Sequence, residues 1–131
     1  MYGKVRVRSV GLTYVRIQVS KDDTSLPQSL DVLVDTGATH TMIPCTILES
    51  MGVTPARRKT VRLADGRTTE RHLGVLYVRC EDRETWTWVL FGEPRDVAVL
   101  GALTLEELSL QVDVEAQRLR DAGEALMIVA A

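Results

Sequence analysis

The sequence contains little cysteine and no long apolar run. Its two cysteines, Cys45 and Cys80, are too few for a disulfide scaffold or a zinc cluster, so we expect two free thiols in a reducing cytoplasm. No apolar stretch approaches the roughly 18 residues of a membrane-spanning helix, and the first ten residues lack the apolar segment of a signal peptide. We therefore expect a cytoplasmic protein that has no membrane partner.

The chain also lacks a large net charge of either sign: its formal net charge is -2 and its pI is about 5.7. Nucleic-acid-binding domains are usually clearly basic, so we expect no nucleic acid partner. The basic cluster at residues 57–59 is too short for a nucleic-acid patch and is predicted to be a solvated turn. With 131 residues, 45% of them hydrophobic, the chain suits one domain with a buried core over residues 1–131.

The dominant hydrophobic period is two, which is typical of half-buried β-strands. The pattern predicts strands at residues 4–10, 14–19, 30–34, 60–63, 68 onward, 73–80, 85–91 and 97–100, a closing hairpin of residues 110–114 and 117–119, and a terminal apolar run at 125–130. A polar stretch at residues 20–29 contains Pro27 and is predicted to be a loop. Asp65-Gly66 between two extended segments predicts a hairpin whose two central residues have positive φ.

Helical patterns are short. Residues 44–51 predict a helix with Pro44 at its first position and Gly52 after its end. Thr104 is predicted to cap a helical turn that continues to Leu108. The sum is a mainly β domain, closed or sandwich-like, with one or two short helices.

Asp35 is the strongest candidate for chemistry, because it follows the apolar residues 30–34 directly. A carboxylate at the end of an apolar strand is costly unless it is paired or hydrogen-bonded. Gly37 allows close approach of the backbone, and Thr36 supplies a hydroxyl that can brace the loop. The sequence thus predicts one acid held on a stiff support. The structural alternative is a turn aspartate that caps its own loop.

The order of these signals resembles the retropepsin-like aspartic proteases, the single-lobed relatives of pepsin. Asp35-Thr36-Gly37-Ala38 matches the active-site loop, residues 60–73 match the flap hairpin, and Val99-Leu100-Gly101 matches the element before the late helix. The resemblance covers residues 17–119, approximately. It implies a closed, β-barrel-like acid-protease fold that forms a single lobe of a homodimer.

The resemblance implies an aspartic endopeptidase that hydrolyses peptide bonds without metal or organic cofactor. Two nearby carboxylates share a proton, so one Asp35 would take a proton from water while the other polarises the scissile carbonyl. The chain has one Asp-Thr-Gly, so a second subunit must supply the other acid. The further implied residues are Thr36, Gly37 and Ala38 in the active-site loop, Ala64, Asp65, Gly66 and Arg67 in the flap, and Leu100 and Gly101 in a supporting loop.

Two features depart from the family pattern. Retroviral flaps are usually rich in glycine, whereas this one has a single Gly66 between Asp65 and Arg67. The tail at residues 120–131 is longer than a minimal subunit needs, and is predicted to be an interface strand or a core strand. The alternative function is therefore a retropepsin-fold binding or dimerisation module with weak or no catalysis. An unrelated small β-barrel that binds a ligand is a third possibility.

Other polar and aromatic residues receive structural interpretations. His40 lacks the ligand spacing of a metal site, and Cys45 has no histidine close to it in sequence, so neither a metalloenzyme nor a cysteine protease is favoured. His72 is predicted to be a surface residue. Trp86 and Trp88 share one face of a strand and are predicted to lie in the core or on a dimer surface.

Overall fold

The computed structural model describes residues 12–124. The predicted strand at residues 4–10 and the apolar run at 125–130 lie outside these residues. The described chain is mainly β with two short helices, as predicted. Its elements in sequence order are β1 (Tyr14–Ser20), β2 (Gln28–Val34), β3 (Thr41–Pro44), α1 (Cys45–Ser50), β4 (Arg57–Arg62), β5 (Thr68–Cys80), β6 (Arg83–Gly92), β7 (Val99–Leu100), α2 (Ala102–Glu107), β8 (Leu110–Asp113) and β9 (Arg118–Asp121).

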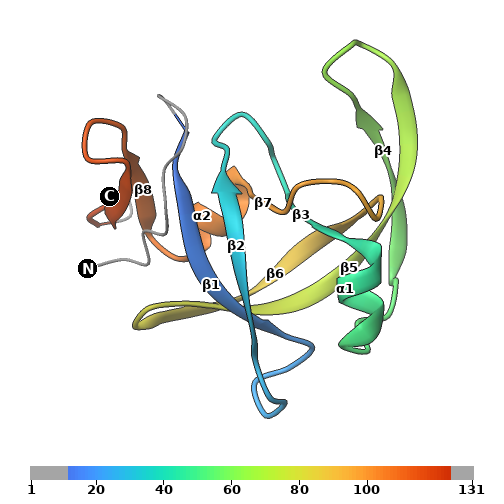
Figure 1. Ribbon diagram of the computed structural model, residues 1–131, viewed down its shortest axis with the longest axis horizontal. Coiled ribbons are helices and arrows are strands. Elements are labelled where there is room, and N and C mark those ends of the chain that lie inside the picture. Colours follow the sequence, from blue (N-terminus) through green and yellow to red (C-terminus); the bar gives the residue numbers. More distant parts are fainter. Residues whose placement is uncertain (1–11, 125–131) are drawn as a thin grey trace, which may run out of the picture.

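The main sheet closes on itself (Figure 1). Its strand order is β1-β2-β7-β3-β6-β5-β4, and β1 also pairs with β5, so β4 is the strand of this sheet that lies outside the ring. The short β7 pairs parallel with β2, and β3 pairs parallel with β6. These crossings bring the end of β2 beside Leu100, which is far away in sequence. The predicted closed β fold is therefore confirmed.

One hydrophobic core lies inside this ring. The strands alternate between buried and exposed residues, and β1 shows this most clearly, with Val15, Ile17 and Val19 almost fully buried. Leu48 of α1 and Leu105 of α2 cover the core from outside the sheet. Leu119 of β9 also joins the core, so the predicted closing hairpin of β8 and β9 packs on the same domain.

The hairpin of β4 and β5 extends away from the body of the molecule (Figure 1). The prediction of a turn at residues 57–59 was wrong, because Arg57, Arg58 and Lys59 lie in β4 and pair with residues of β5. Three consecutive cations obscure the period of two, although a strand that is exposed on both faces tolerates them. The two strands predicted around residues 68 and 73–80 are one continuous 13-residue strand, β5.

The hairpin turn differs in detail from the predicted one. Gly66 has φ of +91°, but Asp65 is not among the described non-glycine residues with positive φ. The N–H of Gly66 donates to the carbonyl of Leu63 over 2.9 Å, and the N–H of Leu63 donates to the carbonyl of Arg67 over 2.7 Å. This is a tight turn followed by one left-handed glycine, the geometry of a hairpin with a bulge. The glycine is needed, but one residue later in the turn than expected.

Both helices begin slightly differently from the prediction. Pro44 ends β3 and precedes α1 as its cap residue, and Gly52 follows the helix with φ of +81°, as expected. Helix α2 begins at Ala102 after Gly101, so Thr104 lies inside the helix and is fully buried instead of capping it. The strand β3 was not predicted, because its four residues offer too short a pattern.

Candidate active site

Asp35 follows β2 directly and is exposed to solvent. Its backbone N–H donates to the carbonyl of Leu100 over 3.0 Å, which extends the pairing of β2 with β7 by one residue. Its carboxylate oxygen Oδ1 accepts the N–H of Gly37 over 2.9 Å. A hydrogen bond from a backbone N–H to a carboxylate oxygen fixes the direction of the carboxylate. The loop thus presents one oriented acid to solvent.

The loop that carries Asp35 is tied to helix α2 behind it. The N–H of Ala38 donates to the carbonyl of Asp35 over 3.1 Å and closes the turn. The carbonyls of Ala38 and Thr39 accept the N–H groups of Ala102 and Leu103, over 2.8 and 3.1 Å. Main-chain bonds of this kind do not depend on side-chain rotamers, so the position of the acid is set by the fold.

Gly101 permits this close contact. A Cβ atom at Gly101 would lie 2.4 Å from both the carbonyl carbon and the carbonyl oxygen of His40, and 2.8 Å from the nitrogen of Thr41. Its own backbone is extended, with φ of −93° and ψ of 174°, so conformation does not require glycine here. The lack of space does require it. The glycine lets the segment before α2 lie against the active-site loop.

A chain of buried hydroxyl groups supports the loop from below. Thr41, Thr87 and Thr104 are almost fully buried, and the Oγ1 of Thr104 lies 2.6 Å from that of Thr41 and 2.8 Å from that of Thr87. Thr41 Oγ1 accepts the N–H of Gly101 over 3.1 Å, and Thr87 Oγ1 donates to Glu107 Oε1 over 2.8 Å.

The two ends of this chain fix its direction. An N–H can only donate and an ionised carboxylate can only accept, so Thr41 donates to Thr104 and Thr104 donates to Thr87. Each hydroxyl then gives one bond and receives one, so every hydroxyl of the network is satisfied, as buried polar groups require. The network joins β3, β6 and α2 beneath the loop of Asp35. Sequence reasoning missed it, because its members lie far apart along the chain.

A cavity of about 500 Å³ lies between the active-site loop and the flap hairpin. Asp35 is the only carboxylate among its lining residues in the described chain. The lining residues are Asp35, Gly37, Ala38, Thr39, His40, Met42, Lys59, Thr60, Val61, Arg62, Leu63, Ala64, Leu90 and Val99. Such a concave site with a few polar groups among apolar ones is the usual form of a ligand-binding cleft.

His40 and Lys59 join the two walls of this cavity. The Nζ of Lys59 on β4 lies 2.9 Å from the Nε2 of His40, which follows the active-site loop. The ammonium can only donate, so this nitrogen of the imidazole accepts and the ring is neutral. Burial lowers the pKa of His40 first of all, and the charges of Lys59 and Arg57 lower it further. The local sequence favours a structural His40 over a metal ligand, and no local pattern indicates its contact with Lys59.

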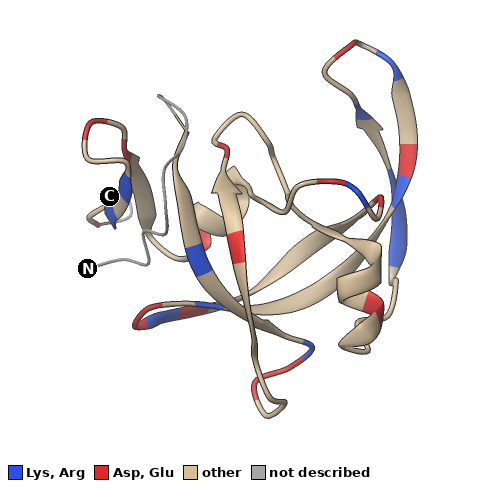
Figure 2. Cartoon of the chain, viewed as in Figure 1, with Lys and Arg blue, Asp and Glu red and all other residues tan. Residues whose placement is uncertain are grey.

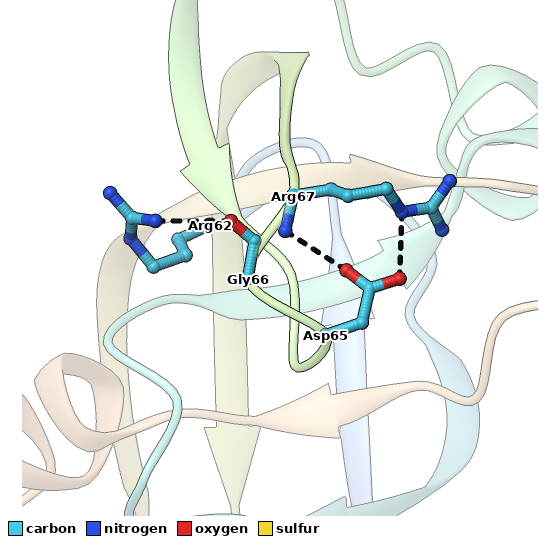
Figure 3. A network of polar contacts seen from close by, with 4 residues as sticks. All are labelled: Arg62, Asp65, Gly66 and Arg67. Atoms are coloured by element: carbon cyan, nitrogen blue, oxygen red, sulfur yellow. Dashed lines mark hydrogen bonds and ion pairs between the residues drawn. The ribbon is translucent and has the colours of Figure 1, made fainter.

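The flap tip is braced by its own charged residues (Figure 3). The carboxylate of Asp65 accepts the backbone N–H of Arg67 over 3.0 Å and the Nε of Arg67 over 2.7 Å. Arg62 donates to the carbonyl of Gly66 over 3.0 Å from the other side of the turn. These contacts stiffen a tip that has one glycine, so the charged residues noted in the sequence hold the turn together.

The structure brings some of the predicted site residues together and separates others. Asp35, Gly37, Ala38 and Ala64 line the cavity. Thr36 is exposed beside Asp35 without lining it. Three flap residues lie at the tip and outside the lining, namely Asp65, Gly66 and Arg67. Leu100 and Gly101 are buried behind the loop that they hold.

A second cavity, of about 380 Å³, lies on the outer side of the flap hairpin. Cys45 and His72 are among its lining residues, so the fold brings both to one cavity, which sequence spacing did not suggest. His72 is exposed as predicted, with its ring edge against Phe91. Within residues 12–124 no group of three histidine, cysteine or acidic side chains is arranged to hold a metal.

Trp86 and Trp88 lie on one face of β6, as predicted. Trp86 is 44% exposed and packs on Tyr77 with ring centroids 5.1 Å apart. The guanidinium of Arg57 lies 4.0 Å above the ring of Trp88, which is a cation–π contact. Neither tryptophan belongs to the core cluster.

Comparisons with known proteins find aspartyl proteases by sequence and retroviral proteases by structure. A family model described as aspartyl protease matches residues 15–103. The EIAV protease complexed with the inhibitor HBY-793 has a similar fold, with a TM-score of 0.59 and 19% identity over 79% of this chain and 94% of that chain. The foamy viral protease-reverse transcriptase in complex with an RNA/DNA hybrid gives a TM-score of 0.57 and 20% identity, over 74% of this chain and 12% of that chain.

No protein of curated function matches the sequence significantly. Among the described residues, no helix has the length and apolar character needed to cross a bilayer.

Proposed function

The chain belongs to the aspartyl protease family, and from this premise we propose that it is an aspartic endopeptidase, active as a homodimer in which each subunit contributes Asp35. The observation that carries the proposal is the exposed Asp35 carboxylate, which main-chain bonds hold at the edge of the cleft. One carboxylate cannot act as acid and base at the same moment. A second copy of the chain, related by a twofold axis, supplies the missing group.

In the proposed reaction the two carboxyl groups share one proton, as is general for aspartic proteases, because two carboxylates so close together cannot both ionise. The ionised Asp35 takes a proton from a bound water, whose oxygen attacks the scissile carbonyl carbon. The protonated Asp35 of the other subunit gives its proton to the carbonyl oxygen. In the collapse of the resulting diol the C–N bond breaks, the protonated carboxyl gives its proton to the leaving nitrogen, and the ionised carboxylate takes the proton of a diol hydroxyl as the carbonyl re-forms. The pair ends with one shared proton again, so it titrates as a unit.

The remaining residues receive supporting roles in this proposal. Thr36 is exposed next to Asp35, where it can join the two active-site loops across the twofold axis. Gly37 lies beside the water site, since a Cβ there would come within 3.2 Å of Asp35 Oδ1. Ala64 brings the flap over the cleft, which excludes bulk water from the reaction.

The proposal extends to organisation and surroundings. We propose one domain over residues 1–131, with residues 120–131 in the subunit interface, and peptides or proteins as substrates. A cytoplasmic location is supported by the free thiols of Cys45 and Cys80. Neither nucleic acid nor membrane is part of the proposed activity, and no metal or organic cofactor takes part in the proposed reaction.

The test is cleavage of a peptide library between about pH 4 and pH 7, with wild type and Asp35→Asn compared at equal dimer content. Asparagine keeps an oxygen that can accept the N–H of Gly37, so the variant should fold normally. We expect a loss of about 10³-fold or more in kcat/KM, in the range usual for removing an acid–base group.

Two results would overturn this proposal. Cleavage that persists in Asp35→Asn would remove Asp35 from the chemistry. Absence of cleavage by a folded wild-type dimer over the whole pH range, together with no binding of a statine-type inhibitor, would favour the binding or dimerisation module instead.

A further inference from the structure

One wall of the cleft carries cations that have no carboxylate partner among the described residues. Arg57 and Lys59 alternate with Arg58 along β4, so they lie on the face of the strand opposite to Arg58. Lys59 lines the cleft, and both Lys59 and Arg57 are close enough to His40 to depress its pKa.

Three other cations of the same hairpin are paired with carboxylates, whereas Arg62, which also lines the cleft, donates to the carbonyl of Gly66. Arg58 lies 3.3 Å from Glu70, Arg67 lies 2.7 Å from Asp65, and Arg71 lies 3.2 Å from Glu93. Within residues 12–124 no ion pair involves Arg57 or Lys59. Figure 2 shows acidic residues at the turn of this hairpin and in β5, whereas the charged residues of β4 are all basic, so acids are available on the hairpin. The cleft is therefore lined by two cations, Lys59 and Arg62, that have no carboxylate partner among the described residues.

Contacts with neutral groups hold Arg57 and Lys59 in place. Arg57 is stacked 4.0 Å from the ring centroid of Trp88. Lys59 donates one hydrogen to His40 Nε2 over 2.9 Å, which leaves two of its three ammonium hydrogens for other acceptors. His40 is not a carboxylate, so this contact does not neutralise Lys59 through an ion pair. The ammonium of Lys59 can therefore bind an anion without first breaking an ion pair to a carboxylate of the protein.

We propose that Lys59, oriented by His40, makes the cleft select peptides that carry an aspartate or glutamate side chain. This proposal rests on the proposed protease function and names its substrate class. A substrate carboxylate would accept the free ammonium hydrogens of Lys59, and the flap would shield this pair from water. His40 acts as a positioning residue, because its proposed effect on the substrate carboxylate is exerted through Lys59.

The proposed twofold axis makes the selection symmetric. Each subunit supplies one Lys59, so an acidic side chain is preferred at one position before the scissile bond and at the matching position after it. Among the described residues, Asp35 is the only carboxylate that lines the cleft, and its two copies share a proton. Their single negative charge leaves the cationic wall dominant.

The experiment compares peptides that differ only by Glu, Gln or Lys at each position from the fourth residue before the scissile bond to the fourth after it. Wild type should cleave the best glutamate peptide with about 10- to 100-fold higher kcat/KM than its glutamine partner, as expected for a charge-assisted hydrogen bond. The ratio should fall at high ionic strength. Lys59→Met should bring it close to one, and Lys59→Glu should favour the lysine peptide instead.

Two further variants distinguish the effect of the Lys59 charge in the cleft from effects of other charges and of general stability. Arg58→Met removes the neighbouring cation, which faces away from the cleft and pairs with Glu70, and should leave the ratio unchanged. His40→Ala should lower the ratio of glutamate to glutamine cleavage, which a loss of general stability would not do.

Binding gives a readout that does not need catalysis. Asp35→Asn should bind a fluorescent glutamate peptide more tightly than its glutamine partner, and the difference should disappear in Asp35→Asn combined with Lys59→Met. If glutamine and glutamate peptides are cleaved equally, the protease proposal stands and the acidic preference is wrong. If nothing is cleaved but the binding difference is found, the acidic selection stands and the protease proposal is wrong. Equal binding and no cleavage would overturn both.

Discussion

Replacement of Gly101 by alanine tests whether the close packing behind the active-site loop determines stability. The new Cβ would lie 2.4 Å from the carbonyl carbon and oxygen of His40, whereas ordinary contact begins at 3.4 Å. Backbone atoms must therefore move by about 1 Å, and no side-chain rotation can relieve the contact. The movement acts on the bonds from Gly101 to Thr41, from Ala102 to Ala38 and from Leu103 to Thr39.

The cost follows from these contacts. Overpacking of a core costs roughly 1–3 kcal/mol, and the upper end applies when only backbone can yield. We expect Gly101→Ala to lower the free energy of unfolding by about 3 kcal/mol. With a urea m-value of about 2 kcal/mol/M for a chain of this size, the midpoint of unfolding should fall by about 1.5 M. Both proteins must be measured at the same concentration, because the proposed dimer formation would also stabilise the folded chain.

Gly66→Ala is the matched control for this substitution. Nothing lies within 4 Å of a Cβ at Gly66, but its φ is +91°, so alanine there has conformational strain and no steric contact. Strain of this kind costs about 1 kcal/mol, which corresponds to a midpoint shift of about 0.5 M. If Gly101→Ala shifts the midpoint no more than Gly66→Ala, the packing argument is wrong.

Two further predictions concern buried groups. Thr104→Val removes the central hydroxyl of the threonine chain while keeping the shape of the side chain, so Thr41 loses an acceptor and Thr87 loses a donor. Urea unfolding should show that the free energy of unfolding falls by about 2 kcal/mol. The control Thr46→Val, at an exposed position, should lower it by less than about 0.5 kcal/mol. Equal losses would mean that the chain does not stabilise the fold. Cys80 is fully buried, and burial raises its pKa to about 11 from an ordinary 9.0, with the charge of Glu81 acting the same way. A thiol reagent at about pH 8 should therefore label only the half-buried Cys45. The free energy of unfolding should fall as pH rises from about 9 through 11, because the thiol of the unfolded chain loses its proton at lower pH than the buried thiol does. Rapid labelling of two thiols, or a loss of stability at alkaline pH that persists in Cys80→Ala, would contradict this.

Local sequence patterns predicted many of the strands and helices of the fold. The alternation at residues 14–19 and 30–34 appeared as β1 and β2, and Gly52 ended α1 with positive φ. A period of two is a property of neighbouring residues, so it can be read without knowledge of partners. The same reading failed at Arg57–Lys59, where a strand exposed on both faces has no apolar alternation, and at β3, which is too short to show a period.

The sequence by itself indicated the aspartic protease family and singled out Asp35 as the candidate acid. One acid after an apolar strand, followed by a threonine and a glycine, is a local pattern that can be recognised in the sequence alone. Only the tertiary structure decided what surrounds that acid. His40 and Lys59 are 19 residues apart, and Thr41 and Thr104 are 63 apart. Each pair meets because of the order in which the strands pair in the main sheet. Contacts between distant residues depend on strand order and register, which no local pattern contains. The charge of the cleft and the support of its loop were therefore visible only after the chain had folded.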